Sequence, residues 1–436
     1  MIPLTAHDVA TACDVVTDVQ ATVTGIAVDS REVRGGELFV ALPGERTDGV
    51  RFVPDALAAG AALALVPSGA DDTEGPLVVV ADPLDGLGRV AAEVRRRSQA
   101  MVVAITGSTG KTSTKDILAA LISPALETVA SYANFNTEIG VPLTLARIEP
   151  TTRAVICELG MRGTGQVAYL AGMCRPGVAV ITGIGPVHLE MMRTVEAVAA
   201  AKAEVLRDLG PDDVAVVPHA EPLLAPHLEA CRARILTFGE EAGADVQLTR
   251  FEGGEAEFAL GGRILTVHVS FPQRHNALNL AAALAACRGM GMDVEELTSH
   301  GLQVVFSRWR GEQLEMAGGG VLIADCYNAN PTSMAAALRH LVAAAGPHRT
   351  VAILGDMAEL GDDAPAYHED VGALARELGV EVVAVGPLAR GYGGRWFPDR
   401  EALVGELDDL LQPGDAVLVK GSRAMGLESV VEALAP

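Results

Sequence analysis

Lysine is nearly missing from this sequence of 436 residues. Of its 33 basic residues only four are lysines, at positions 111, 115, 202 and 420, and arginine supplies every other fixed positive charge. A guanidinium and an ammonium group differ in shape and hydration, so they are not interchangeable at a reactive site. The four lysines are therefore candidates for positions that require a primary amine, although Lys115 also fits an ordinary helix surface.

Other absences narrow the class of protein. The six cysteines form no CxxC pair, which favours reduced thiols of a cytoplasmic protein over a zinc site or a disulfide framework. No run approaches the ~18 apolar residues of a membrane span, and residues 1–16 lack the pattern of a secretory signal. The net charge of −23 argues against a nucleic-acid partner. We expect a cytoplasmic monomer that binds no nucleic acid and does not insert into a membrane.

The length of the chain predicts more than one hydrophobic core. Residues 1–98 contain short strands among Gly, Pro and Asp turns, whereas residues 99–310 alternate apolar strands with helical stretches. Residues 311–436 repeat that alternation on a smaller scale. Strands alternating with helices indicate parallel βαβ units, with ligands at the carboxyl ends of the strands. We therefore predict an α/β protein of three domains with these boundaries.

One segment, MVVAITGSTGKTSTKD at 101–116, predicts a site for a nucleotide triphosphate. An apolar strand leads into a glycine-rich loop and then into a helix, so backbone N–H groups and the helix dipole can surround phosphates. The ordinary P-loop has a glycine five positions before Gly110; this chain has Ile105 there, and Gly107 instead. The predicted phosphate-binding residues are Thr106, Gly107, Ser108, Thr109, Gly110, Lys111, Thr112 and Ser113.

Three further residues are candidates for a metal site. Glu158 ends a predicted strand, where its carboxylate can join the Thr112 hydroxyl on Mg²⁺. His188 lies in another strand-end loop, and Lys202 follows in a helix expected over 195–209. A lysine there can act as an ammonium group or react with CO₂ to give a carbamate, an anionic oxygen donor. A surface carboxylate, a structural histidine and a salt-bridged lysine are the competing interpretations.

Polar loops later in the chain are weaker signals. Asn276 and Asn279 share one face at the start of an alanine-rich helix, where amides can bind a purine edge or cap the helix. The loops after two C-terminal strands, at 325–331 and 420–423, bring polar and cationic side chains to a domain edge. Both loops can face the central domain across a cleft.

Taken together, these segments resemble the Mur ligase family, ATP-dependent amide-forming enzymes of peptidoglycan precursor synthesis. The resemblance extends from about residue 25 to the C-terminus. It rests on a short-spaced TGxxGKT loop at 106–112, ExG at 158–160, IGxxHLE at 184–190, Lys202, HNxxN at 275–279 and DxYNxNP at 325–331.

Residues 29–49 are similar to the N-terminal uridine-nucleotide domain of the later-acting ligases of this family. Three further segments, 134–145, 355–361 and 417–428, are similar to the branch that adds D-alanyl-D-alanine. The DNPR loop usual in the branch that adds the third amino acid is missing from the sequence. One position departs from the pattern: Arg51 precedes Phe52 where relatives commonly have histidine, so the details of uridine recognition stay open.

The resemblance implies an N-terminal uridine-nucleotide domain, a central P-loop-type ATPase domain and a C-terminal Rossmann-like domain. It implies ATP, UDP-N-acetylmuramoyl-tripeptide and D-alanyl-D-alanine as substrates, with two Mg²⁺ sites. A folylpolyglutamate-synthase-like ligase, which usually lacks the first domain, is one alternative. A nucleotide-dependent switch that hydrolyses ATP without an acceptor is another.

The resemblance also implies a role for each candidate. Lys111 would bind phosphates, Thr112 and Glu158 one Mg²⁺, and His188 with carbamylated Lys202 the second. Asn276 and Asn279 would hold adenine, Asp325 the ribose, and Arg310 the phosphates from across the domain junction. The implied contacts to the other substrates are Ser30, Arg31, Asn136, Thr137, Asn328, Asn330, Lys420 and Arg423.

Overall fold

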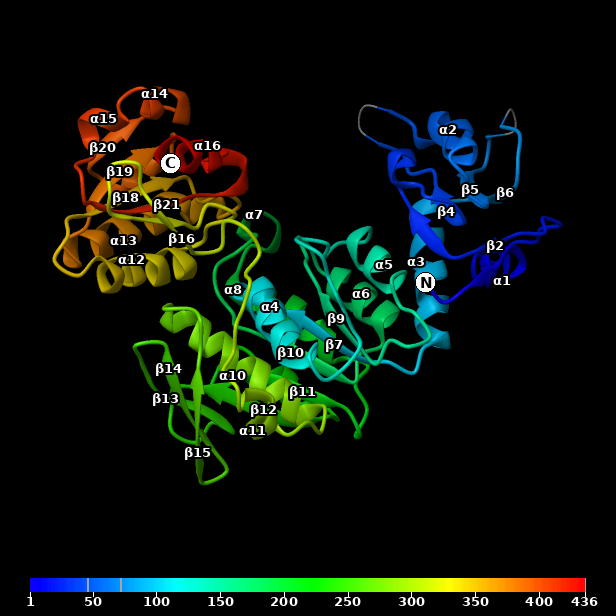
Figure 1. The fold of residues 1–436 in the computed structure, drawn as a ribbon, viewed down its shortest axis with the longest axis horizontal. Helices are drawn as coiled ribbons and strands as arrows, with labels where there is room; N and C mark the ends of the chain where they lie inside the picture. Colours follow the sequence, from blue (N-terminus) through cyan, green and yellow to red (C-terminus); the bar gives the residue numbers. More distant parts are fainter. Residues whose placement is uncertain (45–46, 71–72, 436) are drawn as a thin grey trace.

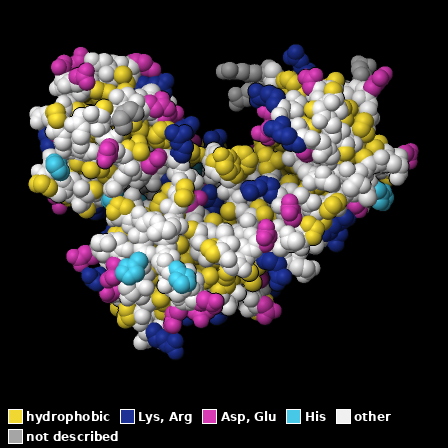
Figure 2. Space-filling view, in the orientation of Figure 1, with side chains coloured by type: hydrophobic (Ala, Val, Ile, Leu, Met, Phe, Trp, Pro, Cys, Tyr) yellow, Lys and Arg dark blue, Asp and Glu magenta, His cyan; other side chains and the backbone are white. Residues whose placement is uncertain are grey.

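The computed structural model describes residues 1–44, 47–70 and 73–435, so Glu45 and Arg46 of the 29–49 segment lie outside the described residues. The chain is an α/β protein with three domains, as predicted. The N-terminal and C-terminal domains stand on opposite sides of the central domain (Figure 1). The space-filling view has an open hollow between these two outer domains (Figure 2). No helix among the described residues is both long and apolar enough to cross a bilayer.

The N-terminal domain is built on a parallel sheet of four strands in the order β3-β4-β5-β6, with a separate antiparallel pair β1-β2. Its strands are β1 (Leu4–Thr5), β2 (Thr22–Val23), β3 (Gly25–Ala27), β4 (Glu37–Val40), β5 (Leu63–Pro67) and β6 (Leu77–Val80). Its helices are α1 (Ala6–Ala12), α2 (Val53–Ala58) and α3 (Pro83–Arg97), with short 3₁₀ turns at Ser30–Glu32 and Gly49–Phe52.

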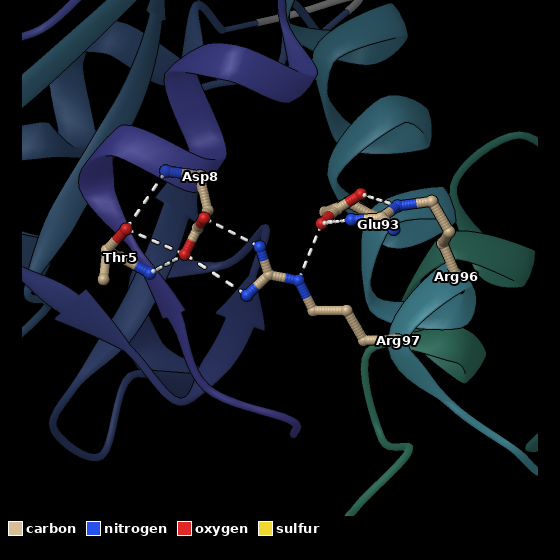
Figure 3. Close-up of polar contacts among 5 residues, drawn as sticks. All are labelled: Thr5, Asp8, Glu93, Arg96 and Arg97. Atoms are coloured by element: carbon tan, nitrogen blue, oxygen red, sulfur yellow. Dashed lines mark hydrogen bonds and ion pairs between the residues drawn. The ribbon is translucent and has the colours of Figure 1, made fainter.

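Helix α3 contacts both its own N-terminal domain and the central domain. Arg97, in its last turn, pairs with Glu93 at 2.6 Å and with Asp8 of α1 at 2.7 Å (Figure 3). Asp8 also completes a capping box with Thr5 at the start of α1. On the other side, Arg95 Nε donates to the carbonyl of Cys174 at 2.8 Å. The helix therefore belongs to the packing of the central domain as much as to its own.

The central domain has a nine-stranded sheet in the order β15-β14-β13-β12-β11-β10-β7-β9-β8. Its strands are β7 (Met101–Thr106), β8 (Thr128–Ala130), β9 (Ala154–Glu158), β10 (Val178–Ile181), β11 (Val214–Pro218), β12 (Arg234–Gly239), β13 (Val246–Glu252), β14 (Glu255–Leu260) and β15 (Arg263–His268). Its helices are α4 (Lys111–Ile122), α5 (Gly140–Leu145), α6 (Gln166–Cys174), α7 (Leu189–Met192), α8 (Val195–Ala203), α9 (Ala225–Glu229), α10 (Arg274–Gly289) and α11 (Val294–Thr298).

Both faces of this sheet are covered at β7, β9 and β10, which is why these strands are apolar. Along β7, Val102 and Ala104 pack in the core that includes α3, α5 and α6, whereas Val103 and Ile105 pack under α4 and α10. The strands β7 to β13 are all parallel, so their carboxyl ends lie at one edge of the sheet.

Two features of the central domain differ from the sequence prediction. The strands β14 and β15 run antiparallel to β13 and extend the sheet, where only parallel strands were expected. Buried and exposed residues alternate along both strands, so one face of this hairpin is open to solvent. The strands therefore contain no long apolar run that the sequence could show. The helix expected over 195–209 ends at Ala203 and continues as a 3₁₀ turn over Glu204–Leu206.

The C-terminal domain has a six-stranded sheet in the order β16-β17-β21-β18-β19-β20, parallel except for β16. Its strands are β16 (Glu312–Glu315), β17 (Val321–Ala324), β18 (Thr350–Gly355), β19 (Glu381–Val385), β20 (Arg395–Phe397) and β21 (Ala416–Lys420). Its helices are α12 (Pro331–Ala345), α13 (Ala364–Glu377), α14 (Arg400–Val404), α15 (Leu407–Leu410) and α16 (Glu428–Leu434).

Candidate active site

The glycine-rich loop between β7 and α4 has a backbone that only glycine suits at two positions. Gly107 has φ of 147° and Gly110 has φ of 79°, both in the region that side chains avoid. A Cβ at Gly107 would lie 2.0 Å from the Thr182 hydroxyl, and one at Gly110 would lie 2.4 Å from Asn279 Oδ1. Both glycines therefore stand where the loop packs closely against its neighbours, Gly107 against the residue after β10 and Gly110 against α10.

Hydrogen bonds hold this loop against the next strand-end loop, residues 182–185. Ser108 Oγ donates to the carbonyl of Gly185 and accepts from its N–H, both at 3.0 Å. The Thr182 hydroxyl donates to the carbonyl of Thr109. Thr106 is fully buried and its hydroxyl donates to Leu159, so this side chain supports the loop from behind. The loop is thus fixed in shape without a ligand.

A cleft of about 1190 Å³ lies between the central and C-terminal domains, and most predicted site residues line it. The predicted residues in its lining are Ser108, Thr109, Gly110, Lys111, Thr112, Ser113, Asn136, Thr137, Glu158, His188, Lys202, Asn279, Arg310, Asp325, Asn328, Asn330, Lys420 and Arg423.

Glu158, at the end of β9, is 1% exposed and only partly satisfied. Its Oε1 accepts from Asn136 Nδ2 at 2.8 Å, whereas its Oε2 has no hydrogen-bond partner among the described residues. A buried, unpaired carboxylate oxygen is costly, and a cation bound at this point would satisfy it. The surface-carboxylate interpretation therefore does not fit this residue.

Two lysines face the same cleft as Glu158. Lys111 Nζ donates to the carbonyl of Gly107 at 2.7 Å. Lys202 is 1% exposed, and no hydrogen bond or ion pair of its amine is found within the described ranges. Burial, reinforced by the nearby charge of Lys111, holds the pKa of Lys202 well below its ordinary value. The salt bridge considered for Lys202 is thus not found among the described residues.

His188 is held by a residue that the sequence analysis did not single out. Its Nδ1 contacts the carboxylate of Glu359, which lies on the loop after β18 in the C-terminal domain. This contact lowers the pKa of Glu359, so the carboxylate is ionised. The two residues line the cleft from opposite domains.

The C-terminal wall of the cleft carries charges that satisfy each other. Lys420, 2% exposed, donates to Asp325 Oδ2 at 2.7 Å and to the carbonyl of Asn328 at 3.0 Å. At the domain junction, Arg310 donates to the Thr112 hydroxyl at 3.2 Å. Its guanidinium carbon also lies 4.0 Å from the centroid of the Tyr327 ring. Arg310 therefore bridges the phosphate loop and the C-terminal domain.

The structure separates the two asparagines of α10. Asn279 lines the cleft, whereas Asn276 is fully buried and does not. Asn279 Nδ2 donates to Asn276 Oδ1 at 3.0 Å. Asn276 is therefore placed to orient Asn279 behind the cleft wall.

Ser30 and Arg31 are not brought to this cleft. Both lie in a 3₁₀ turn of the N-terminal domain, and Arg31 pairs with Asp29 at 2.5 Å. Other residues of the lining were missed at the sequence level, among them His275, Tyr327, Arg339 and Glu359. Tyr327 and Glu359 stand inside the DxYNxNP and 355–361 segments, which offered the only signal for them.

Three family models match consecutive parts of this chain. The Mur ligase family, catalytic domain matches residues 22–104, the Mur ligase middle domain residues 105–287, and the Mur ligase, glutamate ligase domain residues 309–423. The chain belongs to the Mur ligase family. Together these matches span the phosphate loop and both walls of the cleft.

Relatives within the family match almost end to end. UDP-N-acetylmuramoyl-tripeptide–D-alanyl-D-alanine ligase from Synechocystis is 35% identical, over 94% of this chain and 92% of its own. The crystal structure of MurF from Acinetobacter baumannii superposes with a TM-score of 0.89 at 32% identity, covering 99% of this chain and 98% of its own. MurF ligase from Thermotoga maritima in complex with ADP superposes with a TM-score of 0.83 at 30% identity, covering 94% and 96%.

Proposed function

We propose that this Mur ligase joins D-alanyl-D-alanine to UDP-N-acetylmuramoyl-tripeptide at the expense of ATP. The observation that carries the proposal is the single cleft in which a phosphate loop, buried unpaired Glu158 and Lys202, and the loops of the C-terminal domain meet. Relatives named for this reaction match more than nine tenths of the chain.

The reaction needs a better acyl donor than a carboxylate. The γ-phosphoryl group of ATP passes to the terminal carboxylate of the tripeptide and gives an acyl phosphate and ADP. The dipeptide amine then attacks the acyl carbon, phosphate leaves, and the nitrogen loses a proton. Catalysis is mainly alignment and neutralisation of charge. Lys111 and the loop N–H groups hold the phosphates, and Arg310 neutralises charge from the opposite side.

The residues present fit bound Mg²⁺. The unpaired Glu158 Oε2 and the hydroxyl of Thr112, which lines the same cleft, are oxygen donors of the kind Mg²⁺ prefers. Bound Mg²⁺ would neutralise the transferred phosphoryl group. No group of three or more His, Cys, Asp or Glu side chains with metal-site geometry is found in the described part of the chain. A second cation would thus need a further donor beside His188.

Lys202 would supply that donor as a carbamate. Only a neutral amine attacks CO₂, and the lowered pKa of Lys202 keeps more of it neutral. The carbamate oxygens would bind the second Mg²⁺ with His188. Asn279 would hold adenine with Asn276 behind it, and Asp325 the ribose.

The remaining parts of the proposal concern substrate contacts and setting. Ser30 and Arg31 would bind the uridine nucleotide in the N-terminal domain, which would have to approach the cleft by domain closure. The contacts to the tripeptide and dipeptide would come from Asn136, Thr137, Asn328, Asn330, Lys420 and Arg423. We further propose that the three domains span residues 1–98, 99–310 and 311–436, and that the enzyme is a cytoplasmic monomer.

A phosphate-release assay with single components omitted tests the function. We expect release only when ATP, Mg²⁺, UDP-N-acetylmuramoyl-tripeptide and D-alanyl-D-alanine are all present, because the acyl phosphate must form and be consumed. Alanine at Thr112 or Glu158 should weaken binding of the Mg²⁺-nucleotide. Equal release without the dipeptide would instead indicate a nucleotide switch, and activity on a folate acceptor would indicate the folylpolyglutamate-type ligase.

A further inference from the structure

The loop that follows β18, residues 356–361, reaches from the C-terminal domain to the loop that carries His188. The carboxylate of Glu359 contacts His188 Nδ1, and the N–H of Glu190 donates to the carbonyl of Glu359 at 3.3 Å. A Cβ on Gly361 would lie 3.5 Å from the backbone of Leu189 and Glu190. One side-chain contact and one main-chain hydrogen bond therefore join the two domains beside the cleft.

Both partners of the side-chain contact, His188 and Glu359, have an uncommon backbone conformation. His188 has φ of 54° and Glu359 has φ of 62°, although neither is glycine. Such a left-handed residue costs about 1 kcal/mol or more and persists where its surroundings determine it. Here each domain places a residue with this backbone conformation at the contact across the interface.

The contact also fixes the proton on the imidazole. A carboxylate only accepts hydrogen bonds, and that of Glu359 contacts His188 Nδ1. Nδ1 of His188 is therefore the donor, and in the neutral ring Nε2 carries the free lone pair. His188 lines the cleft with Glu158 and Lys202, so this nitrogen is available to a ligand there.

We propose that Glu359 is a positioning residue that orients His188 for the second cation and makes this cation site depend on the seating of the C-terminal domain. The inference rests on the metal site of the proposed function. A carboxylate behind a metal-binding histidine fixes the ring and strengthens it as a ligand. In this chain the carboxylate comes from a different domain, so domain opening would release the imidazole.

The test compares Glu359→Ala and Glu359→Gln with Asp362→Asn, an exposed carboxylate of the next turn. Direct Mn²⁺ binding is measured by electron paramagnetic resonance in the presence of a non-hydrolysable ATP analogue. We expect Glu359→Ala to weaken Mn²⁺ binding about 10- to 100-fold. Glu359→Gln should lose less, because its carbonyl still accepts from Nδ1, and Asp362→Asn should bind as the wild type does.

A second measurement needs no metal. Small-angle scattering of the unliganded protein should give a larger radius of gyration for Glu359→Ala than for Asp362→Asn, because a contact between domains is lost. The side chain of Glu359 is 41% exposed, so replacing it by Ala or Gln leaves the core intact.

Three results would overturn the inference. Wild-type Mn²⁺ affinity in Glu359→Ala, with affinity lost in His188→Ala, would show that Glu359 does not position the ligand. No loss in either variant would remove His188 from the metal site. A raised KM for the dipeptide with unchanged Mn²⁺ binding would make Glu359 a substrate contact. The ligase function is tested separately, by phosphate release from the wild-type enzyme, and none of these three results bears on it.

Discussion

The two walls of the cleft bury a lysine in different ways. On the C-terminal wall, Lys420 donates to Asp325 and to a backbone carbonyl, so its charge is satisfied within the chain. On the central wall, Lys202 is equally buried, and no acceptor for its amine is found in the part of the chain that the structure describes. The same contrast separates Asp325, which is paired, from Glu158, which keeps one oxygen unpaired.

This difference separates support from ligand binding. A buried charge with a partner needs nothing further, whereas removal of that partner leaves a costly group behind. A buried polar atom without a partner lowers stability unless something outside the chain binds it. The central wall therefore holds a buried carboxylate oxygen without a partner, which a ligand would satisfy, and the C-terminal wall holds its loops in shape through its own ion pair.

Replacing Lys202 gives the largest expected effect and tests the central wall. Lys202→Met should lower phosphate release on the order of 100-fold or more, since a charge-stabilising group is removed from the reaction centre. Its thermal midpoint should stay equal or rise, because no ion pair of Lys202 is found among the described residues and a buried amine without a partner is costly. Phosphate release and thermal unfolding, measured on the same preparation, check both.

The carbamate role has its own controls. Lys202→Ala should regain part of its activity with a short carboxylic acid, which replaces the carbamate oxygens. Lys202→Arg cannot form a carbamate and should stay inactive. Normal turnover of Lys202→Arg would refute this role.

Replacing Lys420 should lower stability, which replacing Lys202 should not. Lys420→Met leaves Asp325 without its partner and should destabilise the C-terminal domain by roughly 2–3 kcal/mol, reduced from a fully buried pair because Asp325 is partly exposed. Thermal unfolding measures this loss. The double variant Lys420→Met/Asp325→Asn should recover part of it, and an unchanged midpoint for the single variant would contradict the comparison.

The position of the central wall was predictable from the sequence for a geometric reason. The strands β9, β7 and β10 are neighbours in a parallel sheet, so Glu158, the phosphate loop and the loop of His188 all emerge at one edge. Each of these strands is an apolar run ending in polar or glycine residues, which marks its carboxyl end. Strand ends and their residues thus gave both the fold and this half of the site.

The contacts between domains could not be predicted in this way. Glu359 reaches His188, and Arg310 reaches Thr112, only because the C-terminal domain is seated on the central one. Residues 171 positions apart in the chain carry no shared local pattern. Burial of Asn276 and the hairpin of β14 and β15 likewise depend on tertiary packing, which overrides local preference.

A histidine between the two walls should make stability depend on pH. Burial lowers the pKa of His275 to about 4, and its neighbours are His340, Asp325 and Lys420. In the unfolded chain this histidine is protonated below about pH 6.5, whereas in the folded protein it stays neutral until about pH 4. The free energy of unfolding should therefore be unaffected by His275 above about pH 6.5 and should fall as the pH drops from there towards 4. The loss is at most about 1.4 kcal/mol per pH unit.

His275→Gln should flatten this dependence, as measured by thermal unfolding between pH 7 and pH 4. His340→Gln serves as the comparison, because burial also lowers the pKa of His340. If His275→Gln keeps the wild-type pH dependence of stability while His340→Gln loses it, His340 and not His275 causes that dependence.

The smallest effect is expected away from both walls, where the chain uses paired charges to join helices. Arg97 bridges Asp8 and Glu93, and its side chain is 30% exposed (Figure 3). Arg97→Gln should cost about 1 kcal/mol at pH 7, since partly exposed ion pairs are worth little. Hydrogen bonds from arginines lower the pKa of both carboxyls. The contribution is therefore present above about pH 4 and is lost on further acidification.

Thermal unfolding at pH 7 and pH 3 measures this contribution, with Arg96→Gln as the matched control. Arg96 is 60% exposed and pairs with Glu93 of its own helix, so its loss should change the midpoint less. Phosphate release should be unchanged in both, because neither side chain lines the cleft. A large loss of activity in Arg97→Gln with unchanged stability would mean that α1 and α3 act on the reaction. The comparison of paired support with unpaired ligand groups would then fail outside the cleft.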